Sequence, residues 1–480
     1  ALAAGMAALA LGPAERFART AIRGHFTRRE DLRSVTLDEL YAAAGLDNGR
    51  HVVQDGFDPA TQHHMETVFT LGNGRFASRG TFEEGYPGES ALTFAHGIWD
   101  DMPIAFTELV NLPNWLNLTI RVDGEEFRLD RGEILDFRRY TDLRHGVMRR
   151  AVTWRAPGGK VIDLLFERFH AYNREPVGAI RLLATAVSHP CALSISAGID
   201  GHVSNQDLLH LRLVGQGAEP GKAIWLAADT RHTGRRITVA ATVKADVSVG
   251  RAAEPLAGNC PGFPALMVAT ELLPGQTMQV DKLASILSDR DLPAVIAGHS
   301  SDVGNAAVNE VPDLTYDRLR EGHVAAWERI WEQGDIIIEG DDEAQLALRF
   351  NLFQLLIAAP QTDERVSIGA KSLSGYGYRG HVFWDTEIFM LPYLIYTYPR
   401  TARNMLMYRY HGLPGARRKA AAGGFSGAQF PWESAETGDE VTPRWVPDFT
   451  DPTRLIRIWT GDIQIHITAD IAYAVMQYWR

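Results

Sequence analysis

The chain has 480 residues, enough for two or three domains, and its 45% hydrophobic and 22% charged residues are ordinary for a globular protein with a sizeable core. Its formal net charge of −11 argues against nucleic acid and anionic membranes as partners. Two cysteines, Cys191 and Cys260, cannot build a disulfide framework or a zinc cluster, and no apolar run is as long as a membrane span. We therefore expect a cytoplasmic protein that binds neither membrane nor nucleic acid.

The N-terminal part divides into a short extension and a long β-rich region. Residues 1–50 are rich in Ala and Arg, and their pattern predicts a helical extension to which no chemistry can be assigned. From 51 to 305 apolar residues recur at every second position, most clearly in WLNLTIRVDGEEFRLD at 115–130 and RRITVAATVKADVSVG at 235–250. Asp123-Gly124 in the first of these segments is typical of a tight hairpin turn. Many such strands predict an antiparallel β-sandwich.

The period then changes to that of a helix. In DRLREGHVAAWERIWEQ, apolar side chains recur every three or four residues, which predicts a helix in a linker spanning 306–341. Helical segments continue from 342 to 480, and between them lie two long loops rich in Gly, Ser and Trp, at 367–385 and 424–440. Loops of this length in a compact domain are usually functional. We therefore expect an α-barrel whose loops gather around a pocket.

Each of these two loops pairs a tryptophan with a carboxylate. GHVFWDTE contains Trp384 and Asp385, and FPWESAETGDE contains Trp432 and Glu433. An indole can pack against a sugar ring while a carboxylate accepts hydrogen bonds from the sugar hydroxyls. The alternative is that the indoles fill a core and the acids cap helices. Two loops of the same kind favour the first interpretation and predict two adjacent sugar subsites.

Other polar motifs offer further candidates for binding or catalysis. His381 and His466 precede predicted helices and are candidates for organising the loops or contacting a ligand. LGNGRFASRG is rich in glycine but lies in no βαβ unit, which argues against nucleotide binding. His63 and His64 are neighbours whose side chains diverge, and the chain has neither an HExxH nor a CxxC motif. We therefore predict no metal site.

The motifs, taken in order, resemble glycoside hydrolase family 65, the α-glucosyl disaccharide phosphorylases that act on maltose, trehalose, kojibiose or nigerose. The resemblance covers about residues 55–480. The matching segments are ETVFTLGNGRFASRGTFEE at 66–84, LVNLPNW at 109–115, HVAAWERIWE at 323–332, SIGAKSLSGYGYRGHVFWDTEIFMLP at 367–392, YRYHGLPGARRKAAAGGFSGAQFPWES at 408–434 and HITADIAYAV at 466–475. The FWDTE and PWES segments are the most specific of them.

The resemblance implies an architecture and a set of roles. It implies a β-sandwich at 51–305, a helical linker at 306–341 and the N-terminal part of an (α/α)6 catalytic barrel at 342–480. By this resemblance Trp384 and Asp385 bind the glucosyl unit, and Trp432 and Glu433 lie near the acceptor sugar. The substrates would be a disaccharide and inorganic phosphate, with no cofactor and no metal, and relatives of this kind are often homodimers.

The sequence departs from the family pattern in its catalytic groups. The family mechanism inverts the anomeric centre: a carboxylic acid protonates the glycosidic oxygen while phosphate attacks from the opposite face. The Gly-Pro-Asp-Glu-Tyr-like motif that carries this acid, and the Ser-Gly pair and His that bind phosphate, are absent from the sequence. We expect them beyond Arg480, so that the chain is a segment of a longer enzyme.

Three alternatives stay open at this point. Glu387, Glu433 or Glu440 could replace the missing acid. The protein could be a hydrolase of the same family, in which a second carboxylate activates water. It could also be a sugar-binding module without catalytic activity. The sequence leaves open which disaccharide linkage would be recognised.

Overall fold

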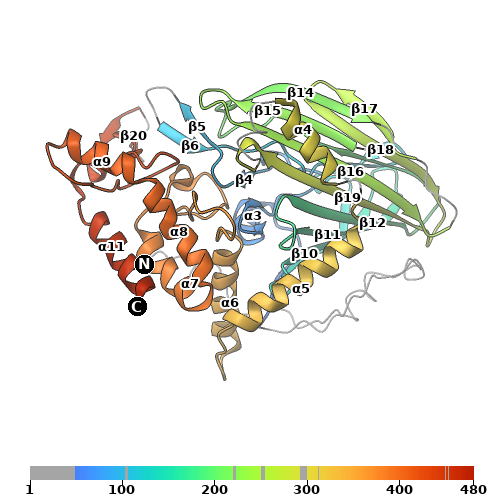
Figure 1. The fold of residues 1–480 in the computed structure, drawn as a ribbon. Coiled ribbons are helices and arrows are strands. Elements are labelled where there is room, and N and C mark those ends of the chain that lie inside the picture. Colours follow the sequence, from blue (N-terminus) through green and yellow to red (C-terminus); the bar gives the residue numbers. More distant parts are fainter. Residues whose placement is uncertain are drawn as a thin grey trace.

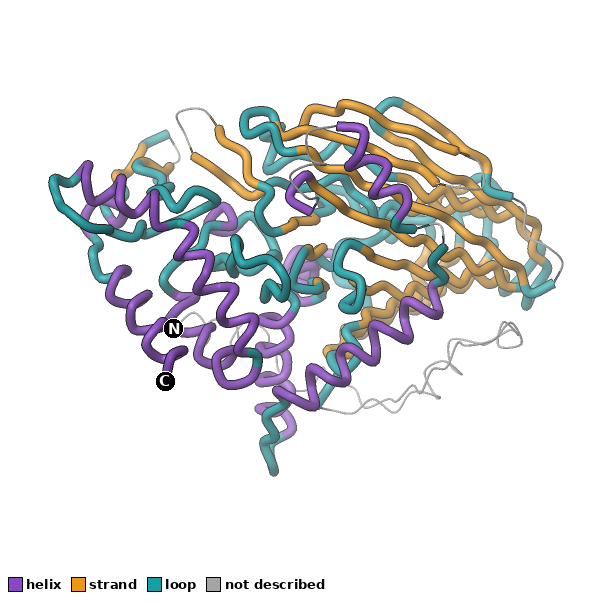
Figure 2. Tube along the Cα trace, in the orientation of Figure 1, coloured by secondary structure: helices purple, strands orange, loops and turns teal. Residues whose placement is uncertain are grey.

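The computed structural model describes residues 49–102, 106–219, 223–249, 254–291, 300–311, 313–448, 450–451 and 453–480. The helical extension predicted for 1–50 therefore lies almost wholly outside the described residues. A sheet-rich N-terminal region and a helical C-terminal region lie side by side (Figure 1), and Figure 2 shows most of the strands gathered on one side of the molecule and most of the helices on the other. None of the helices in the described part is both long and apolar enough to cross a membrane.

The sheet-rich region is a sandwich of two antiparallel sheets. The larger has nine strands in the order β1 (His51–Asp55), β9 (Glu133–Asp142), β10 (Val147–Arg155), β11 (Val161–His170), β12 (Val177–Ala186), β19 (Thr277–Ser288), β16 (Arg236–Val247), β15 (Ala223–Thr230) and β14 (Leu211–Glu219). The smaller has five strands in the order β17 (Leu256–Cys260), β18 (Phe263–Leu272), β13 (Cys191–Gly198), β7 (Leu118–Val122) and β8 (Glu125–Glu126). Their facing sides bury one apolar core, as the alternating pattern requires.

The hairpin predicted around Asp123-Gly124 is confirmed. Val122 pairs with Glu125, and Asp123 and Gly124 have φ angles of 49° and 85°, as a primed turn requires. β8 is only two residues long, although the predicted alternation continued to Leu129. Phe127 still donates its amide to the Ile120 carbonyl over 2.9 Å and stays fully buried. The apolar pattern therefore predicted burial correctly beyond the end of the strand.

Shorter elements lie between the sandwich and the helices (Figure 1). They comprise η3 (Pro59–Thr61), α3 (Gln62–Val68), a three-stranded sheet of β2 (Leu71–Gly72), β3 (Phe76–Ser78) and β4 (Thr93–Ala95), and a hairpin of β5 (Trp99–Met102) and β6 (Phe106–Leu109). These elements include the LGNGRFASRG segment. Gly74 has φ of 83° and its backbone packs against the Ala359 carbonyl, which a side chain would displace. Gly74 therefore serves close packing between the two regions.

Helices cover the outer face of the nine-stranded sheet. η4 (Asp289–Asp291) leads to α4 (Ser300–Asn309), which packs on that face, and α5 (Tyr316–Gly334) crosses it further along. The apolar face predicted for α5 is confirmed, since Leu319, Trp327 and Trp331 are buried. The Trp327 ring stacks on Phe353 with centroids 4.9 Å apart. This helix therefore links the sandwich to the helices that follow.

The C-terminal region is helical, and the order and type of elements expected for the fold are confirmed. Its elements are α6 (Asp342–Leu356), η5 (Gly377–Gly380), η6 (Thr386–Met390), α7 (Leu391–Thr397), α8 (Pro399–His411), α9 (Leu413–Ala422), β20 (Trp445–Pro447), β21 (Leu455–Arg457), α10 (Thr460–Ile463) and α11 (Ile467–Trp479). Two details differ from the expectation. One predicted helical stretch divides into α8 and α9 at Gly412, and the β20–β21 hairpin was not predicted. The boundaries 51–305, 306–341 and 342–480 stay predictions.

Candidate functional site

The two Trp–acid loops are joined by an isolated antiparallel bridge. Val382 donates its amide to the Ser434 carbonyl over 2.9 Å, and the Ser434 amide donates to the Val382 carbonyl over 3.0 Å. Arg409 of α8 reinforces the bridge, because it donates to the Ser434 hydroxyl and to the Phe383 carbonyl, each over 2.9 Å. His381 directly precedes Val382, and Glu433 directly precedes Ser434. The bridge therefore places His381 and Glu433 side by side.

The imidazole of His381 is fully buried and joins three segments. Its Nε2 donates to the Thr107 carbonyl of β6 over 2.6 Å, and its Nδ1 lies 2.7 Å from a carboxylate oxygen of Glu433. Trp99 of β5 packs against the ring, with the ring centroids 5.8 Å apart. Because both ring nitrogens already have protein partners, His381 is placed to orient Glu433. This arrangement favours the organising role over direct contact with a ligand.

The predicted indoles meet at His466. The His466 ring lies edge-on to Trp384 and to Trp432, with centroids 5.0 and 5.9 Å apart. His466 stands at the N-terminus of α11, where its Nδ1 pairs with Asp470 over 2.5 Å, one turn further along the helix. Both indoles are half-buried, so part of each ring faces outward. The structure therefore brings Trp384, Trp432 and His466 into one aromatic group.

Asp385 differs from the other acids of these loops. It directly precedes η6 and is half-buried, and no described residue forms a hydrogen bond or ion pair with its carboxylate. A carboxylate left in this way beside an indole can accept hydrogen bonds from the hydroxyls of a ligand. The Asp385 carboxylate, next in the sequence to Trp384, is thus available to a ligand as far as the described residues are concerned.

The three acids considered as replacements for the missing catalytic group all have protein partners. Glu387 is buried and accepts two hydrogen bonds from Arg409, over 2.8 and 2.9 Å. Glu440 pairs with Lys419 over 2.5 Å and also accepts the Trp432 amide. Glu433 is held by His381, as described above. None of these three carboxyl groups is free to donate a proton to a ligand. This argues against the interpretation that one of them replaces the missing catalytic acid.

The β5–β6 hairpin contributes to the site but was not predicted to do so. Besides the Thr107 carbonyl and Trp99, it contains Asp100 and Glu108, which hold opposite nitrogens of His210 over 3.0 and 2.6 Å. Burial lowers the pKa of His210, but the hydrogen bonds to Asp100 and Glu108 outweigh it and raise the pKa to about 9. Trp99-Asp100 is likewise a tryptophan followed by an acid, but Trp327-Glu328 and Trp331-Glu332 of α5 show the same pattern, so this signal alone could not have identified the hairpin from the sequence.

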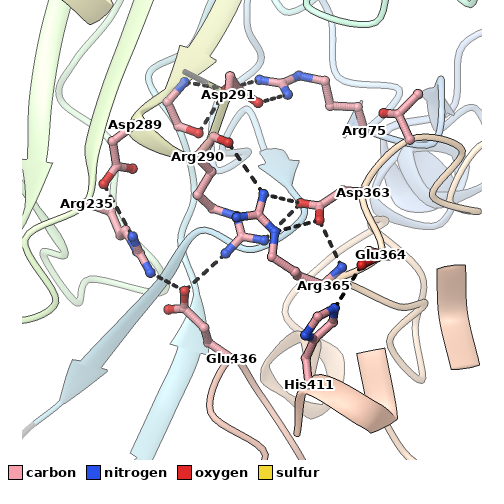
Figure 3. A network of polar contacts seen from close by, with 12 residues as sticks. Arg75, Arg235, Asp289, Arg290, Asp291, Asp363, Glu364, Arg365, His411 and Glu436 are labelled. Carbon is pink, nitrogen blue, oxygen red and sulfur yellow. Dashed lines mark hydrogen bonds and ion pairs between the residues drawn. The ribbon is translucent and has the colours of Figure 1, made fainter. Parts of the chain in front are cut away.

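An ion-pair network fixes the second loop to the sandwich (Figure 3). Glu436, two residues after the bridge, pairs with Arg235 and accepts from Arg290 over 3.1 Å. Arg290 also donates to Asp363 of the helical region over 2.9 Å. A cavity of about 320 Å³ lies beside this network, and another of about 270 Å³ lies further into the N-terminal region. Neither cavity is lined by any of the predicted site residues.

Comparison with known proteins identifies the two regions separately. The model of the glycosyl hydrolase family 65 N-terminal domain matches residues 52–330, and the model of the family's central catalytic domain matches residues 349–480. A solved structure named for a kojibiose phosphorylase from the human microbiome matches with a TM-score of 0.76 at 22% identity. The aligned part covers 90% of this chain and 56% of the chain of the solved structure. At this level of identity the likeness supports the fold alone.

Curated relatives are similar over most of this chain. The kojibiose phosphorylase of Caldanaerobacter subterraneus subsp. tengcongensis is 39% identical over 447 residues, covering 89% of this chain and 56% of that protein. The kojibiose phosphorylase of Escherichia coli is 32% identical, with 88% and 55% covered, and the nigerose phosphorylase of Lachnoclostridium phytofermentans is 31% identical, with 85% and 56% covered. The chain spans about half the length of the curated relatives it matches. Because the two family models together match most of the sequence, the chain belongs to glycosyl hydrolase family 65.

Proposed function

We propose that the protein carries the sugar-binding part of a disaccharide phosphorylase, which converts an α-linked glucose disaccharide and phosphate into β-glucose 1-phosphate and glucose. The observation that carries the proposal is the joining of two Trp–acid loops at the Val382–Ser434 bridge, in a chain that matches both models of the family. Kojibiose is the first substrate to test, because several relatives, from 39% to 32% identical, are named kojibiose phosphorylases.

The proposed roles of Trp384, Asp385, Trp432 and Glu433 are those that the family resemblance implies, and the contacts of His381 and His466 support them. Trp384 packs against the glucosyl ring, and the Asp385 carboxylate accepts hydrogen bonds from its hydroxyls. Trp432 and Glu433 bound the acceptor sugar. His381 holds the Glu433 carboxylate at 2.7 Å, and His466 sets the angle between the two indoles. Orientation of this kind lowers the entropic cost of bringing the reacting groups together.

The chemical step needs groups that these loops do not supply. A carboxylic acid must protonate the glycosidic oxygen as phosphate attacks the anomeric carbon from the opposite face. Glu387, Glu433 and Glu440 are each held by protein partners, so we assign the acid to none of them. We propose that the acid and the phosphate site lie beyond Arg480, and that the helices there complete an (α/α)6 barrel. Inorganic phosphate would be the co-substrate, in a cytoplasmic enzyme that could form a homodimer.

The proposal is tested with the reading frame extended past Arg480. The enzyme is incubated with kojibiose, nigerose, trehalose and maltose, with and without phosphate, and β-glucose 1-phosphate and free glucose are measured together. We expect β-glucose 1-phosphate to form from kojibiose only when phosphate is present. Two glucose molecules released without phosphate would instead identify a hydrolase. Saturable binding of a disaccharide without any product would identify a binding module.

A further inference from the structure

A second group of ionisable side chains lies in the N-terminal region, away from the two loops. α3 (Gln62–Val68) places His63 and Glu66 three residues apart, and residues at this spacing share one face of a helix. Glu89 follows Gly88, which has φ of 81°, and is brought close to that face. One atom from each of the three side chains lies within 4.8 Å of the others. The His63 Nδ1 and a Glu89 carboxylate oxygen are 3.7 Å apart.

Within this group the Glu66 carboxylate has unmet bonding capacity. Glu66 is 1% exposed, and its Oε1 accepts a hydrogen bond from no donor group among the described residues. Burial and the neighbouring Glu89 carboxylate raise the pKa of Glu66 to about 8. Its other oxygen lies 3.4 Å from an Arg79 nitrogen, too long for a strong hydrogen bond. Both terminal nitrogens of Arg79 already donate over 2.8 Å to the carbonyls of Ser374 and His63. A buried carboxylate oxygen without a partner is costly, and it therefore points to a ligand.

A neighbouring side chain supports this independently. The hydroxyl of Thr81 is also buried, at 3% exposed, and also has no partner in the described part of the protein. Thr81, Glu66 and Glu89 all line the cavity of about 270 Å³. The two carboxyl groups of Glu66 and Glu89 thus border a space large enough for several water molecules beside a bound ion. The group is not a surface cluster of acids with solvent on all sides.

We propose that His63, Glu66 and Glu89 bind one divalent first-row transition-metal ion. One imidazole nitrogen and two carboxylate oxygens suit an ion such as Zn²⁺, whereas Mg²⁺ prefers oxygen ligands alone. Two positive charges would compensate the two carboxylates that the fold holds together. The ion would tie α3 to the turn that contains Glu89, so the proposed role is structural and separate from sugar binding. It departs from the expectation that the neighbouring histidines have no metal role.

The experiment titrates the metal-free full chain with ZnCl2 by calorimetry, in a Cys260→Ser background because this exposed thiol could bind Zn²⁺ by itself. We expect one equivalent of Zn²⁺ to bind and to raise the melting temperature. His63→Ala should weaken binding by at least ~10-fold, the smallest loss usual for removing groups that support a metal site. Glu89→Gln should do the same. His64→Ala is the matched control, because His64 is an equally exposed neighbour outside the group, and it should leave the affinity unchanged.

Each contrary outcome is distinct. Equal Zn²⁺ affinity in the His63→Ala and His64→Ala variants would overturn the proposal, as would the absence of a stoichiometric site. If Glu89→Gln lowered the Zn²⁺ affinity while His63→Ala kept the full affinity, the site would contain only oxygen ligands. That result would equally contradict the proposal, because it excludes the His63 nitrogen as a ligand. Both histidines are exposed, so neither variant should impair folding. Mg²⁺ at the same concentrations should leave the melting temperature unchanged.

Discussion

Single residues determine how the two Trp–acid pairs differ. Glu433 is committed to His381, whereas the Asp385 carboxylate has no partner among the described residues. Replacing Asp385 by Asn should therefore weaken kojibiose binding without destabilising the fold. Hydrogen bonds to a charged group contribute about 1.5–3 kcal/mol each, which corresponds to a loss of roughly 10- to 100-fold in affinity. Calorimetric titration of the chain with kojibiose measures the loss.

The matched control for this variant is Asp136→Asn, an exposed carboxylate on β9 of the sandwich. It should leave both affinity and melting temperature unchanged. If Asp385→Asn bound kojibiose as tightly as the parent, Asp385 would not contact the sugar. If instead it lowered the melting temperature by several degrees, the carboxylate would have a structural role, and the assignment to a sugar subsite would have to be withdrawn.

Among the elements, the β5–β6 hairpin has a stability that should depend on pH. The folded pKa of His210 is about 9, above the ordinary value of 6.5, because Asp100 and Glu108 bond its two nitrogens. Its contribution is fully present below pH 6.5 and is lost as the pH rises through 9. At about 1.4 kcal/mol per pKa unit, the shift corresponds to a contribution on the order of 3 kcal/mol. Urea unfolding at pH 6.5 and 9.5 measures it as the difference between the parent and His210→Gln.

The parent must be compared with the His210→Gln variant because another buried group, Lys282, changes the pH dependence of stability in the opposite direction. Burial lowers the pKa of Lys282 to about 7, so its contribution to stability rises with pH over the same interval. His210→Gln keeps Lys282 and removes only the histidine. We expect the variant to be less stable than the parent at pH 6.5 and closer to it at pH 9.5. A stability gap that is equal at both pH values would refute the assignment.

At this scale the limits of prediction from sequence are also clear. The β7–β8 hairpin and α5 were predictable because their turn residues and apolar periods are local properties. The Trp–acid pairs were recognisable for the same reason. The contacts that bring the two Trp–acid pairs together could not be predicted from the sequence. His381 and Glu433 are 52 positions apart, and His381 and Thr107 are 274 positions apart. Such contacts depend on how whole elements pack, which no local pattern reports.

For the whole molecule, the network in Figure 3 should hold the helical region against the sandwich. Glu436 binds Arg235 and Arg290, and Arg290 is 6% exposed, so its charge is shielded from water. Replacing Glu436 by Gln leaves two arginines with one anionic partner fewer. Removing one partner of a fully buried ion pair costs about 3–5 kcal/mol. Because Glu436 is partly exposed and Arg290 keeps Asp363, we expect a smaller loss, on the order of 1–2 kcal/mol, in urea unfolding.

The same loop contains a second acid, Asp439, that can serve as a control. Asp439→Asn removes the same charge as Glu436→Gln, but from an exposed ion pair outside the network. Asp439 pairs with Arg418, but the two side chains are 41% and 58% exposed, and water screens exposed ion pairs so that they contribute little to stability. Asp439→Asn should therefore change the unfolding free energy little, and kojibiose affinity not at all. Glu436→Gln should weaken kojibiose binding as well, because Glu436 lies two residues from the bridge that positions Glu433. Equal effects of the two variants would mean that the Glu436 network neither stabilises the molecule nor positions the proposed sugar-binding residues.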